Sequence, residues 1–326
     1  MERSGHMLDQ RYRLGRLLGQ GGMASVYLAE DTRLGKAVAV KVLSQAYALQ
    51  PKVVQRFSQE ARAISRVRHA NVVDVTDHGV TPDGTVYMVM ELLQGEDLSA
   101  TLEREGPLPW TRLGPIALQI CAALATVHRA GIVHRDIKPS NCFRVRVAGN
   151  PDVIKVLDFG IAKVQDPDAD IGQALTRAGT IFGTAEYMSP EQARGDPHDH
   201  RVDVYALGVI VYQMLAGRTP FVADSFMGLL RQHMYEAPPR PGNDARVATL
   251  QGGCSRSFVV RLGKISLGCG TRRLPLAPRT VRRVSTSSPW PLAFRFAHTM
   301  LVSPSLRSGL ELTVLDRHRM AGQPAQ

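Results

Sequence analysis

The chain has 326 residues, 44% of them hydrophobic, which is enough to bury one large two-lobed domain or two smaller ones and excludes disorder as the default. Its four cysteines form no C-x-x-C pair and stand beside no histidine at metal-ligand spacing, which argues against a zinc site and against a secreted disulfide scaffold. No signal peptide and no run of about 18 uncharged apolar residues occurs, so we expect a soluble, cytoplasmic chain without a membrane segment.

The net charge of +11 is confined to the C-terminal part of the chain. Residues 246–326 hold 12 Arg, one Lys, one Glu and one Asp and supply all of this charge, whereas residues 1–245 are neutral. A basic segment suggests a nucleic-acid or membrane partner. Its paired arginines, however, lack the interleaved aromatic residues that stack on bases. We therefore expect no specific nucleic acid partner.

The first part of the chain predicts a β-rich lobe. Residues 12–45 contain short β-branched runs on either side of a glycine turn, which indicates strands. Residues 53–67 place apolar side chains three and four positions apart, which predicts a helix with one apolar face. Two further strands are predicted at 72–75 and 85–92.

The following part predicts a larger helical lobe. Long helices are expected at 113–130 and 202–215, and a shorter one at 226–235. Strands are expected near Val133, near Val145 and at 154–157. A small β-rich lobe therefore precedes a larger helical one.

A glycine-rich segment, residues 18–26, lies between the first two predicted strands. Glycines let backbone N–H groups approach triphosphate oxygens with no Cβ in the way. Any glycine-rich hairpin looks similar, so the segment alone does not decide its function. A dinucleotide-binding turn would open a helix and have an acidic residue about 20 positions on, whereas here a strand and a lysine follow.

That lysine, Lys41, lies in a hydrophobic strand, where an unpaired charge is costly. A phosphate oxygen and the carboxylate of Glu60, on the following helix, would satisfy it. The alternative is a lysine whose ammonium group reaches solvent.

Two later motifs carry the chemistry. His134-Arg135-Asp136-Ile137-Lys138-Pro139-Ser140-Asn141 and Asp158-Phe159-Gly160 supply two carboxylates, an amide and a lysine at the spacing that metal-assisted phosphoryl transfer requires. Together with Ser189-Pro190-Glu191 and Asp203, they make the segment from Tyr12 to Pro239 resemble the bacterial branch of the eukaryotic-type (Hanks-type) Ser/Thr protein kinases. Chance agreement of five ordered motifs is negligible.

The resemblance implies ATP and Mg²⁺ as cofactors and a role for each catalytic residue. Asp136 would accept the proton of the substrate hydroxyl, and Lys138 would stabilise the transferring γ-phosphoryl group. Asn141 and Asp158 would hold Mg²⁺, which offsets charge on the phosphate oxygens.

The resemblance also implies a nucleotide pocket. Lys41, paired with Glu60, would orient the α- and β-phosphates. Val26 and Ala39 would lie above the adenine and Phe143 below it. Met90 would lie at the back of the pocket, and Glu91 and Leu93, in the hinge, would offer backbone groups to the adenine edge. The other residues expected around ATP are Leu18, Gly19, Gly21 and Gly22 of the glycine-rich segment. Ordinary core packing is the alternative for each apolar one.

The substrate class follows from the same resemblance. Lys138, two residues after Asp136, and Gly183-Thr184 ahead of the Ser-Pro-Glu motif are typical of Ser/Thr rather than tyrosine kinases, and Thr184 would hydrogen-bond Asp136 and Lys138. Arg135 would clamp a phosphate on Thr176 or Thr180, which predicts autophosphorylation, with a homodimer as the assembly that permits it. A small-molecule kinase of the same fold is the alternative to a protein kinase.

Some positions depart from the family pattern. Ala24 replaces the third glycine, and Cys142-Phe143 replaces an aliphatic pair after Asn141, but neither argues against catalysis. Residues 144–152 make a longer hairpin than many relatives have, and we expect this hairpin to alter surface shape only.

The resemblance ends near Ala245, where the family continues with helices that carry an arginine partner for Glu191. Residues 250–326 show no sustained helical periodicity and contain six prolines. A basic arm, an unrecognised structured extension and out-of-frame sequence are the alternatives. We favour the last because the change falls in mid-domain. If Glu191 is buried without its arginine, the unpaired carboxylate costs about 3–5 kcal/mol.

We therefore predict a two-lobed α+β protein kinase fold in residues 12–245, with an N-lobe at 12–93 and a C-lobe at 94–245 that lacks its last helices. A basic Arg/Pro/Ser-rich tail, disordered or non-native, follows at 246–326. The predicted activity is transfer of the ATP γ-phosphoryl group to Ser or Thr hydroxyls of proteins. The alternative is a truncated, catalytically impaired ATP-binding or interaction remnant of such a kinase.

Overall fold

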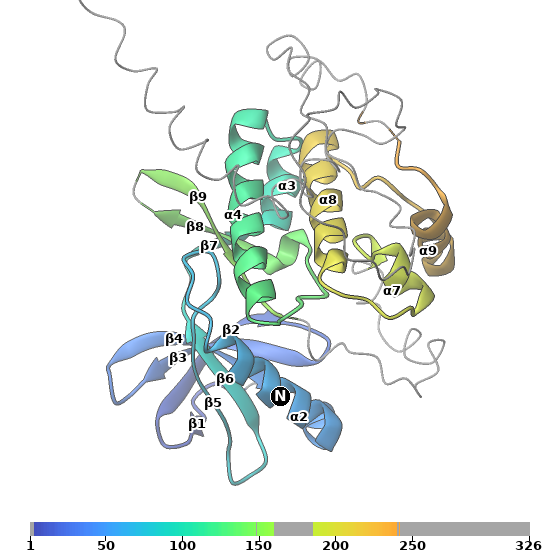
Figure 1. Ribbon diagram of the computed structural model, residues 1–326. Helices are drawn as coiled ribbons and strands as arrows, with labels where there is room; N and C mark the ends of the chain where they lie inside the picture. Colours follow the sequence, from blue (N-terminus) through green and yellow to red (C-terminus); the bar gives the residue numbers. More distant parts are fainter. Residues whose placement is uncertain (1–2, 148, 160–184, 240, 242–326) are drawn as a thin grey trace, which may run out of the picture.

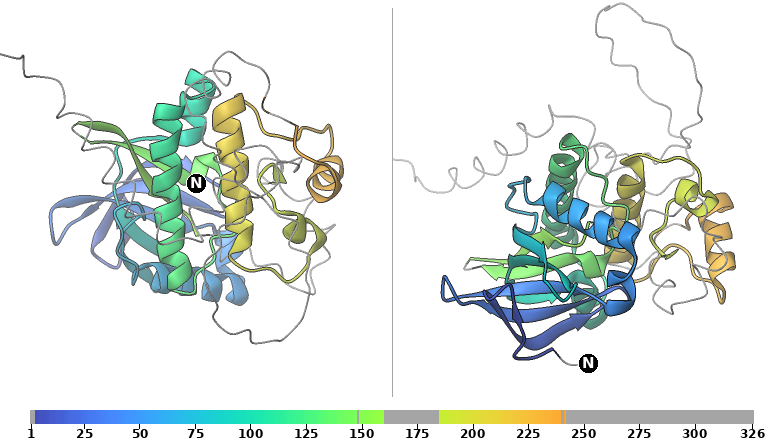
Figure 2. Two further views of the ribbon diagram at one scale, coloured as in Figure 1. Left: turned by 45° about the horizontal axis from the view of Figure 1, so that its top comes forward. Right: turned by 90° about the horizontal axis from the view of Figure 1, so that it is seen from below.

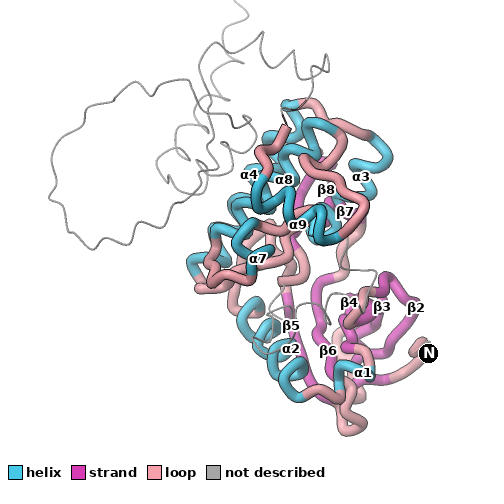
Figure 3. The backbone as a smooth tube through the Cα atoms, turned by 90° about the vertical axis from the view of Figure 1, so that its right-hand side faces the viewer, coloured by secondary structure: helices cyan, strands magenta, loops and turns pink. Residues whose placement is uncertain are grey.

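The structure is a computed structural model that describes residues 3–147, 149–159, 185–239 and 241. They form a small lobe built on one sheet and a larger, mainly helical lobe (Figure 1). In the side view of Figure 3 the strands of the small lobe stand apart from the helices of the large lobe. The two-lobed α+β arrangement predicted from the sequence is confirmed, while the tail at 246–326 lies outside the described residues.

The small lobe is built on a six-stranded antiparallel sheet with strand order β1-β2-β3-β4-β6-β5. One face of this sheet packs a separate core that includes Tyr12, Tyr27, Val40 and Tyr87, and the other face contributes to the main core. The small-lobe elements are β1 (Met7–Leu8), β2 (Tyr12–Gln20), β3 (Ala24–Asp31), β4 (Lys36–Leu43), α1 (Gln45–Ala48), α2 (Pro51–Ile64), β5 (Val75–Val80) and β6 (Val86–Glu91).

Helix α2 is the predicted amphipathic helix of the small lobe. It buries Phe57, Glu60, Ala61 and Ile64, which recur every three or four residues. It begins at Pro51, whose fixed φ suits the first turn of a helix, and therefore starts two residues earlier than predicted. Glu60 is the charged member of this buried face and lies among the core residues.

The large lobe places two long helices side by side, α4 and α8 (Figures 1 and 2). Helix α8 is apolar on nearly all sides, which is the pattern of a core helix, and it ends at Gly217 with a φ of 73°. The large-lobe elements are β7 (Gly95–Asp97), α3 (Leu98–Glu105), α4 (Trp110–Arg129), η1 (Pro139–Asn141), β8 (Cys142–Val147), β9 (Asn150–Val156), α7 (Pro190–Arg194), α8 (Arg201–Ala216) and α9 (Phe226–Tyr235).

Helix α4 is, among the described residues, the one helix long and apolar enough to cross a membrane by length and composition. In the structure it is a core helix: Leu113, Ile116, Ile120 and Leu124 are each 0% exposed. Its apolar residues therefore pack against the rest of the large lobe.

Two predicted strands are absent at the positions expected. Residues 72–74 form no strand, although Val72 makes an isolated parallel bridge to Val156, and β5 begins at Val75. The segment around Val133 is also not a strand. The reason is local, because Arg135 adopts a φ of 64°, which an extended strand does not allow.

The packing of α4 yields a stability prediction. Leu124→Ala removes a fully buried side chain and is expected to lower the free energy of unfolding by about 3 kcal/mol. Leu118→Ala, on the same helix but 37% exposed, is the matched control and should cost much less. Chemical denaturation followed by circular dichroism measures both. Equal losses for the two variants would contradict the placement of α4 in the core.

Candidate active site

A single buried carboxylate, that of Asp203 in the first turn of α8, holds the loop that contains the His-Arg-Asp motif. Asp203 Oδ2 accepts a hydrogen bond from the backbone N–H of His134 at 2.8 Å, and Oδ1 accepts one from the N–H of Arg135 at 2.7 Å. His128 Nε2, on α4, lies 2.7 Å from Asp203 Oδ2. The loop is therefore fixed to both long helices of the large lobe.

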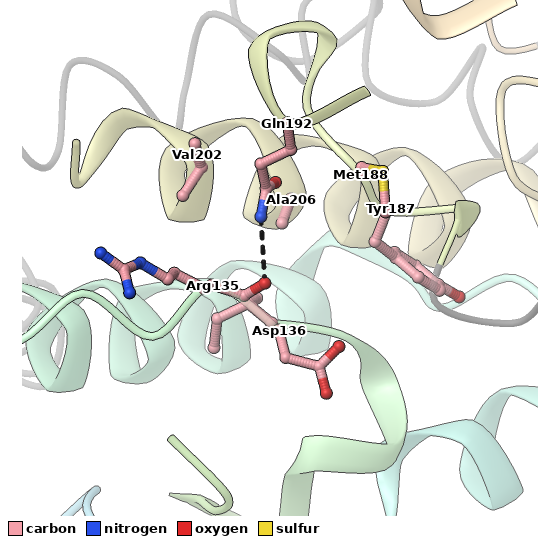
Figure 4. A pocket seen from close by; sticks show the side chains of 8 residues that line it. Arg135, Asp136, Tyr187, Met188, Gln192, Val202 and Ala206 are labelled. Carbon is pink, nitrogen blue, oxygen red and sulfur yellow. Dashed lines mark hydrogen bonds between the residues drawn. The ribbon is translucent and has the colours of Figure 1, made fainter. Parts of the chain in front are cut away.

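The same loop is held from a second side by α7. Gln192 donates from Nε2 to the backbone oxygen of Arg135 at 3.1 Å, as Figure 4 shows. Gln192 also closes a capping box with Ser189 at the start of α7. These contacts hold Arg135 at its positive φ, a conformation that costs about 1–3 kcal/mol and is often found at functional sites.

The predicted catalytic residues converge in this loop. Asn141 donates from Nδ2 to the backbone oxygen of Asp136 at 2.7 Å and to Asp136 Oδ2 at 3.1 Å. Lys138 Nζ lies 3.5 Å from Asp136 Oδ2. The structure thus brings together a carboxylate, an amide and an ammonium group, with the carboxylate itself only 8% exposed.

An ion pair connects the two lobes at this site. Lys41 Nζ, on β4 of the small lobe, lies 2.8 Å from Asp158 Oδ1 of the large lobe. Asp158 is thus a direct partner of Lys41 that the sequence did not predict, and the charge of Glu60, the predicted partner, also acts on Lys41. The backbone of Asp158, whose side chain contacts Lys41, adopts a positive φ of 49°.

Burial and charge oppose each other in this pair. Burial is the largest influence on the pKa of Lys41 and would lower it, but the charges of Asp158 and Glu60 outweigh burial, so the pKa lies above its usual value. Burial would raise the pKa of Asp158, but Lys41 outweighs it and holds the pKa below its usual range. Both groups are therefore charged at neutral pH.

A histidine next to the catalytic loop is neutral for the opposite reason. Burial lowers the pKa of His134 and outweighs the nearby charges of Asp203 and Asp136. His134 Nε2 lies 2.8 Å from the backbone oxygen of Leu157, and its ring packs on Phe159 with centroids 4.7 Å apart. His134 thus links the two catalytic motifs through an uncharged ring.

The two predicted Mg²⁺ ligands lie at the same end of the β8–β9 hairpin. Cys142 pairs with Val156, and the N–H of Leu157 donates to the backbone oxygen of Asn141 at 2.9 Å. Asn141 and Asp158 flank these contacts directly. An amide and a carboxylate fit Mg²⁺, which takes oxygen ligands and is usually bound by one or two carboxylates together with substrate phosphates.

The glycine-rich segment joins β2 to β3. Gly21 donates from its N–H to the Ala24 backbone oxygen at 2.8 Å, which closes the turn. A Cβ added at Gly19 would meet no heavy atom within 4 Å, so protein packing does not require glycine there. The backbone at Gly19 is exposed and open to an approaching group. Leu18 is 39% exposed, and Gly22 lies in the same turn.

The predicted adenine residues come from both lobes. Val26, Ala39 and Met90 belong to one apolar cluster, and Ala39 lies opposite Met90 in the sheet. Phe143 lies on β8, opposite Asp97 of β7. The pairing of β7 with β8 brings the segment after the hinge next to Phe143.

The hinge residue Glu91 ends β6 and is fixed by its side chain. Its Oε1 accepts hydrogen bonds from Lys155 Nζ at 2.7 Å and from the N–H of Asp74 at 2.8 Å. Its own N–H donates to the Asp74 oxygen at 3.0 Å. Leu93 follows two residues later, outside any strand.

Some of the predicted site lies outside the described residues, and some of the observed site was missed. Thr176, Thr180 and Thr184 belong to residues 160–184, which the structure does not describe. Sequence reasoning missed Gln192 and His128. The Ser-x-x-Gln capping pattern at Ser189 could have indicated Gln192, whereas no local pattern indicates that His128 reaches Asp203.

The free-energy cost predicted at Glu191 requires that its carboxylate be buried, and in the structure it is not. Glu191 is of intermediate exposure, and its charge acts on Arg201. A large cost for a fully buried, unpaired carboxylate therefore does not arise. The arginine-bearing helices that the family adds would fall beyond residue 241, outside the described residues.

Two lobes with a lysine–aspartate pair between them and an aspartate–amide pair beside it form the arrangement expected of a protein kinase domain. Comparison with protein families agrees: the family described as "Protein kinase domain" matches residues 12–244. The chain therefore belongs to the protein kinase family, in its bacterial Ser/Thr branch.

Individual relatives place the chain in this branch. It is 45% identical over 247 residues to the serine/threonine-protein kinase pkn3 of Myxococcus xanthus, which covers 75% of this chain and 45% of that protein. It is 42% identical over 237 residues to the serine/threonine-protein kinase PknB of Mycolicibacterium smegmatis, which covers 72% of this chain and 37% of that protein. The chain thus spans less than half the length of these relatives.

A solved structure supports the fold. The kinase domain of PknI from Mycobacterium tuberculosis, crystallised as a point mutant, superposes with a TM-score of 0.53 at 26% identity, covering 72% of this chain and 91% of that chain. The kinase fold predicted from the sequence is confirmed by this likeness and by the family match.

The role of Asp203 leads to an activity prediction. Asp203→Asn replaces one of two accepting oxygens by an NH₂ group that faces a backbone N–H, so the loop with Asp136 is displaced. We expect kcat for phosphoryl transfer to fall about 10²-fold, a loss typical of small misplacements of catalytic groups, with the affinity for Mg²⁺·ADP retained. Steady-state kinetics and calorimetry measure the two quantities.

Asp199→Asn is the matched control, since Asp199 precedes the same helix and its side chain is 48% exposed. It should keep wild-type kcat. A folded Asp203→Asn variant with undiminished kcat would show that the loop does not depend on this carboxylate.

Proposed function

We propose that this chain is a Ser/Thr protein kinase that transfers the γ-phosphoryl group of ATP to a Ser or Thr hydroxyl oxygen of a protein and releases ADP. The observation that carries the proposal is the 2.8 Å pair between Lys41 and Asp158, which joins the lobes next to Asp136 and Asn141. Phosphoryl transfer depends mainly on positioning and on charge stabilisation, and these are the properties of this cluster.

Asp136 would take the proton of the attacking hydroxyl. Its Oδ2 accepts a hydrogen bond from Asn141 and lies near the ammonium group of Lys138, so the carboxylate is oriented by two neighbours. Lys138 would also stabilise the negative charge of the transferring group. A positioned general base of this kind contributes about 10²- to 10⁴-fold to the rate.

The nucleotide and metal would be held by the groups between the lobes. Asn141 and Asp158 would hold Mg²⁺, and Lys41 would hold the α- and β-phosphates below the glycine-rich segment. Bound Mg²⁺ would offset the negative charge of the phosphate oxygens. Lys41 is charged at neutral pH because carboxylates surround it, which is the state that phosphate binding requires.

A protein substrate is favoured by the segment around Ser189, whose capping box anchors it and whose Gln192 holds the catalytic loop. The names of the relatives, serine/threonine-protein kinases, point in the same direction. Location in the cytoplasm stays a prediction of the sequence.

The first test is Mg²⁺-dependent transfer from labelled ATP by the purified chain, onto itself and onto a generic basic protein. We expect incorporation, and we expect Asp136→Asn to reduce it about 10²- to 10⁴-fold because the general base is lost. Asp224→Asn, which changes an exposed aspartate, is the control and should keep full incorporation. Chelation of Mg²⁺ should abolish the signal.

The opposite result has a specific meaning. The family match ends at residue 244, close to the point where the composition changes. Folded protein that binds Mg²⁺·ATP without transferring phosphate would favour the alternative, an impaired nucleotide-binding remnant.

Autophosphorylation is the second activity we propose. Arg135, held beside Asp136, would clamp a phosphate on Thr176 or Thr180. Mass spectrometry after incubation with Mg²⁺·ATP should find at least one of these threonines modified. If two copies react with each other, the initial rate should rise with the square of the protein concentration. Active protein with neither threonine modified would contradict the proposal.

A further inference from the structure

Six charged side chains of the large lobe form a closed ring of ion pairs, away from the catalytic motifs. Arginines and carboxylates alternate around the ring, so its net charge is zero. In order, the members are Arg104, Glu96, Arg144, Asp152, Arg112 and Glu105, which again meets Arg104. We call this set the ion ring.

The contacts of the ion ring are close throughout. Arg104 Nη2 donates to Glu96 Oε1 at 2.6 Å and to Glu105 Oε1 at 2.7 Å. Arg112 Nη2 donates to Asp152 Oδ1 at 2.9 Å, and Arg144 Nη1 donates to the same oxygen at 3.0 Å. The pairs Arg144–Glu96 and Arg112–Glu105 complete the ring.

Arg144 is the buried member on which the ring depends. Its side chain is 5% exposed, against 48% for Arg104. It bridges two carboxylates that come from different elements, Glu96 on β7 and Asp152 on β9. A buried arginine is tolerated only when it is paired in this way.

This finding corrects an expectation about the hairpin at 144–152. The longer hairpin was expected to alter surface shape only, but its two end residues, Arg144 and Asp152, are 5% and 8% exposed. They fix the hairpin to α3 and α4. The position of β7–β9 against these helices is visible in Figure 1.

Two members of the ion ring lie on strands that adjoin parts of the proposed nucleotide pocket. Glu96 lies directly opposite Arg144 in the β7–β8 pairing, and the next pair is Asp97 with Phe143. β7 follows the hinge at Leu93, and β8 follows Asn141. The Glu96–Arg144 pair therefore sets the register between the hinge and the segment with the adenine and Mg²⁺ residues, because a slip of one residue reverses every side chain.

The backbone at this crossing leaves no room for adjustment. A Cβ added at Gly95 would lie 2.0 Å from the Arg144 backbone oxygen, so β7 and β8 approach as closely as glycine allows. Lys155 on β9, opposite Phe143, adds a second connection to the hinge through Glu91.

All three carboxylates of the ring keep their charge at neutral pH. The guanidinium of Arg104 holds the pKa of Glu96 well below its usual range, and Arg112 lowers the pKa of Glu105. Burial would raise the pKa of Asp152, but Arg112 and Arg144 outweigh it and lower the pKa. The ring is therefore fully ionised.

We infer that Arg144 is a positioning residue for nucleotide binding, which acts through the ion ring by holding the hinge strand and the Phe143 strand in register. The inference rests on the proposed function. It requires that loss of Arg144 weaken nucleotide binding although Arg144 itself touches no nucleotide.

The test measures the dissociation constant of Mg²⁺·ADP by calorimetry on the full chain. Arg144→Met should raise it about fivefold, within the range for residues that act on a site without contacting its ligand. Arg146→Met is the matched control, since Arg146 lies two residues further on the same strand but is exposed. It should leave the constant at the wild-type value.

A double variant separates positioning from stability. Arg144→Met with Glu96→Gln removes both charges of the cross-strand pair and leaves four ring charges in balance. Its midpoint of thermal unfolding should recover toward that of the wild type, whereas its dissociation constant should stay raised. It also carries the test if Arg144→Met alone does not fold.

Two results would overturn the inference: equal binding of Mg²⁺·ADP by Arg144→Met and Arg146→Met, or recovery of binding together with stability in the double variant. A failure of the proposed kinase function would give a different result from a failure of the role of Arg144. Wild-type protein that binds Mg²⁺·ADP without transferring phosphate defeats the kinase proposal, while the ratio of dissociation constants still decides the role of Arg144. Wild-type protein that binds no Mg²⁺·ADP defeats both.

Discussion

The catalytic loop depends on one buried carboxylate. Asp203 is 1% exposed, and a charge so deeply buried is costly unless its oxygens are satisfied. It is satisfied by the backbone N–H groups of His134 and Arg135 and by His128, and its place in the first turn of α8 adds the favourable end of the helix dipole. Because the donors are backbone groups, the carboxylate fixes the path of the chain, and Asp136 and Asn141 follow from that path.

The contact between the lobes has a different character. Lys41 and Asp158 belong to separate lobes, so their 2.8 Å pair exists only while the lobes stand in this relation. The Lys41 side chain is only 17% exposed, so its charge is expensive to bury alone, and the carboxylate of Asp158 lowers this cost.

Much of this architecture could be read from the sequence, and the failures have physical causes. The apolar faces of α2 and α4 are periodic and α8 is a long apolar run, so these helices were predicted to within a few residues. The segment at Val133 has the composition of a strand, but Arg135 adopts a positive φ and donates its backbone N–H to Asp203. The Lys41–Asp158 pair joins residues far apart in the chain, and nothing local distinguishes Asp158 from Glu60 as the partner of Lys41.

The ion ring shows the same limit more sharply. Six charges spread over residues 96–152 read, one by one, as solvated surface, and a hairpin insertion reads as a surface feature. Only the fold brings them together in alternating order, with the most buried member, Arg144, opposite Glu96. Apolar periodicity thus specifies where the elements lie, whereas buried charge pairs specify their exact mutual register. Both the Asp203 contacts and the ion ring act on the backbone next to the site, so precision in this active site comes from polar groups that do not themselves meet the substrate.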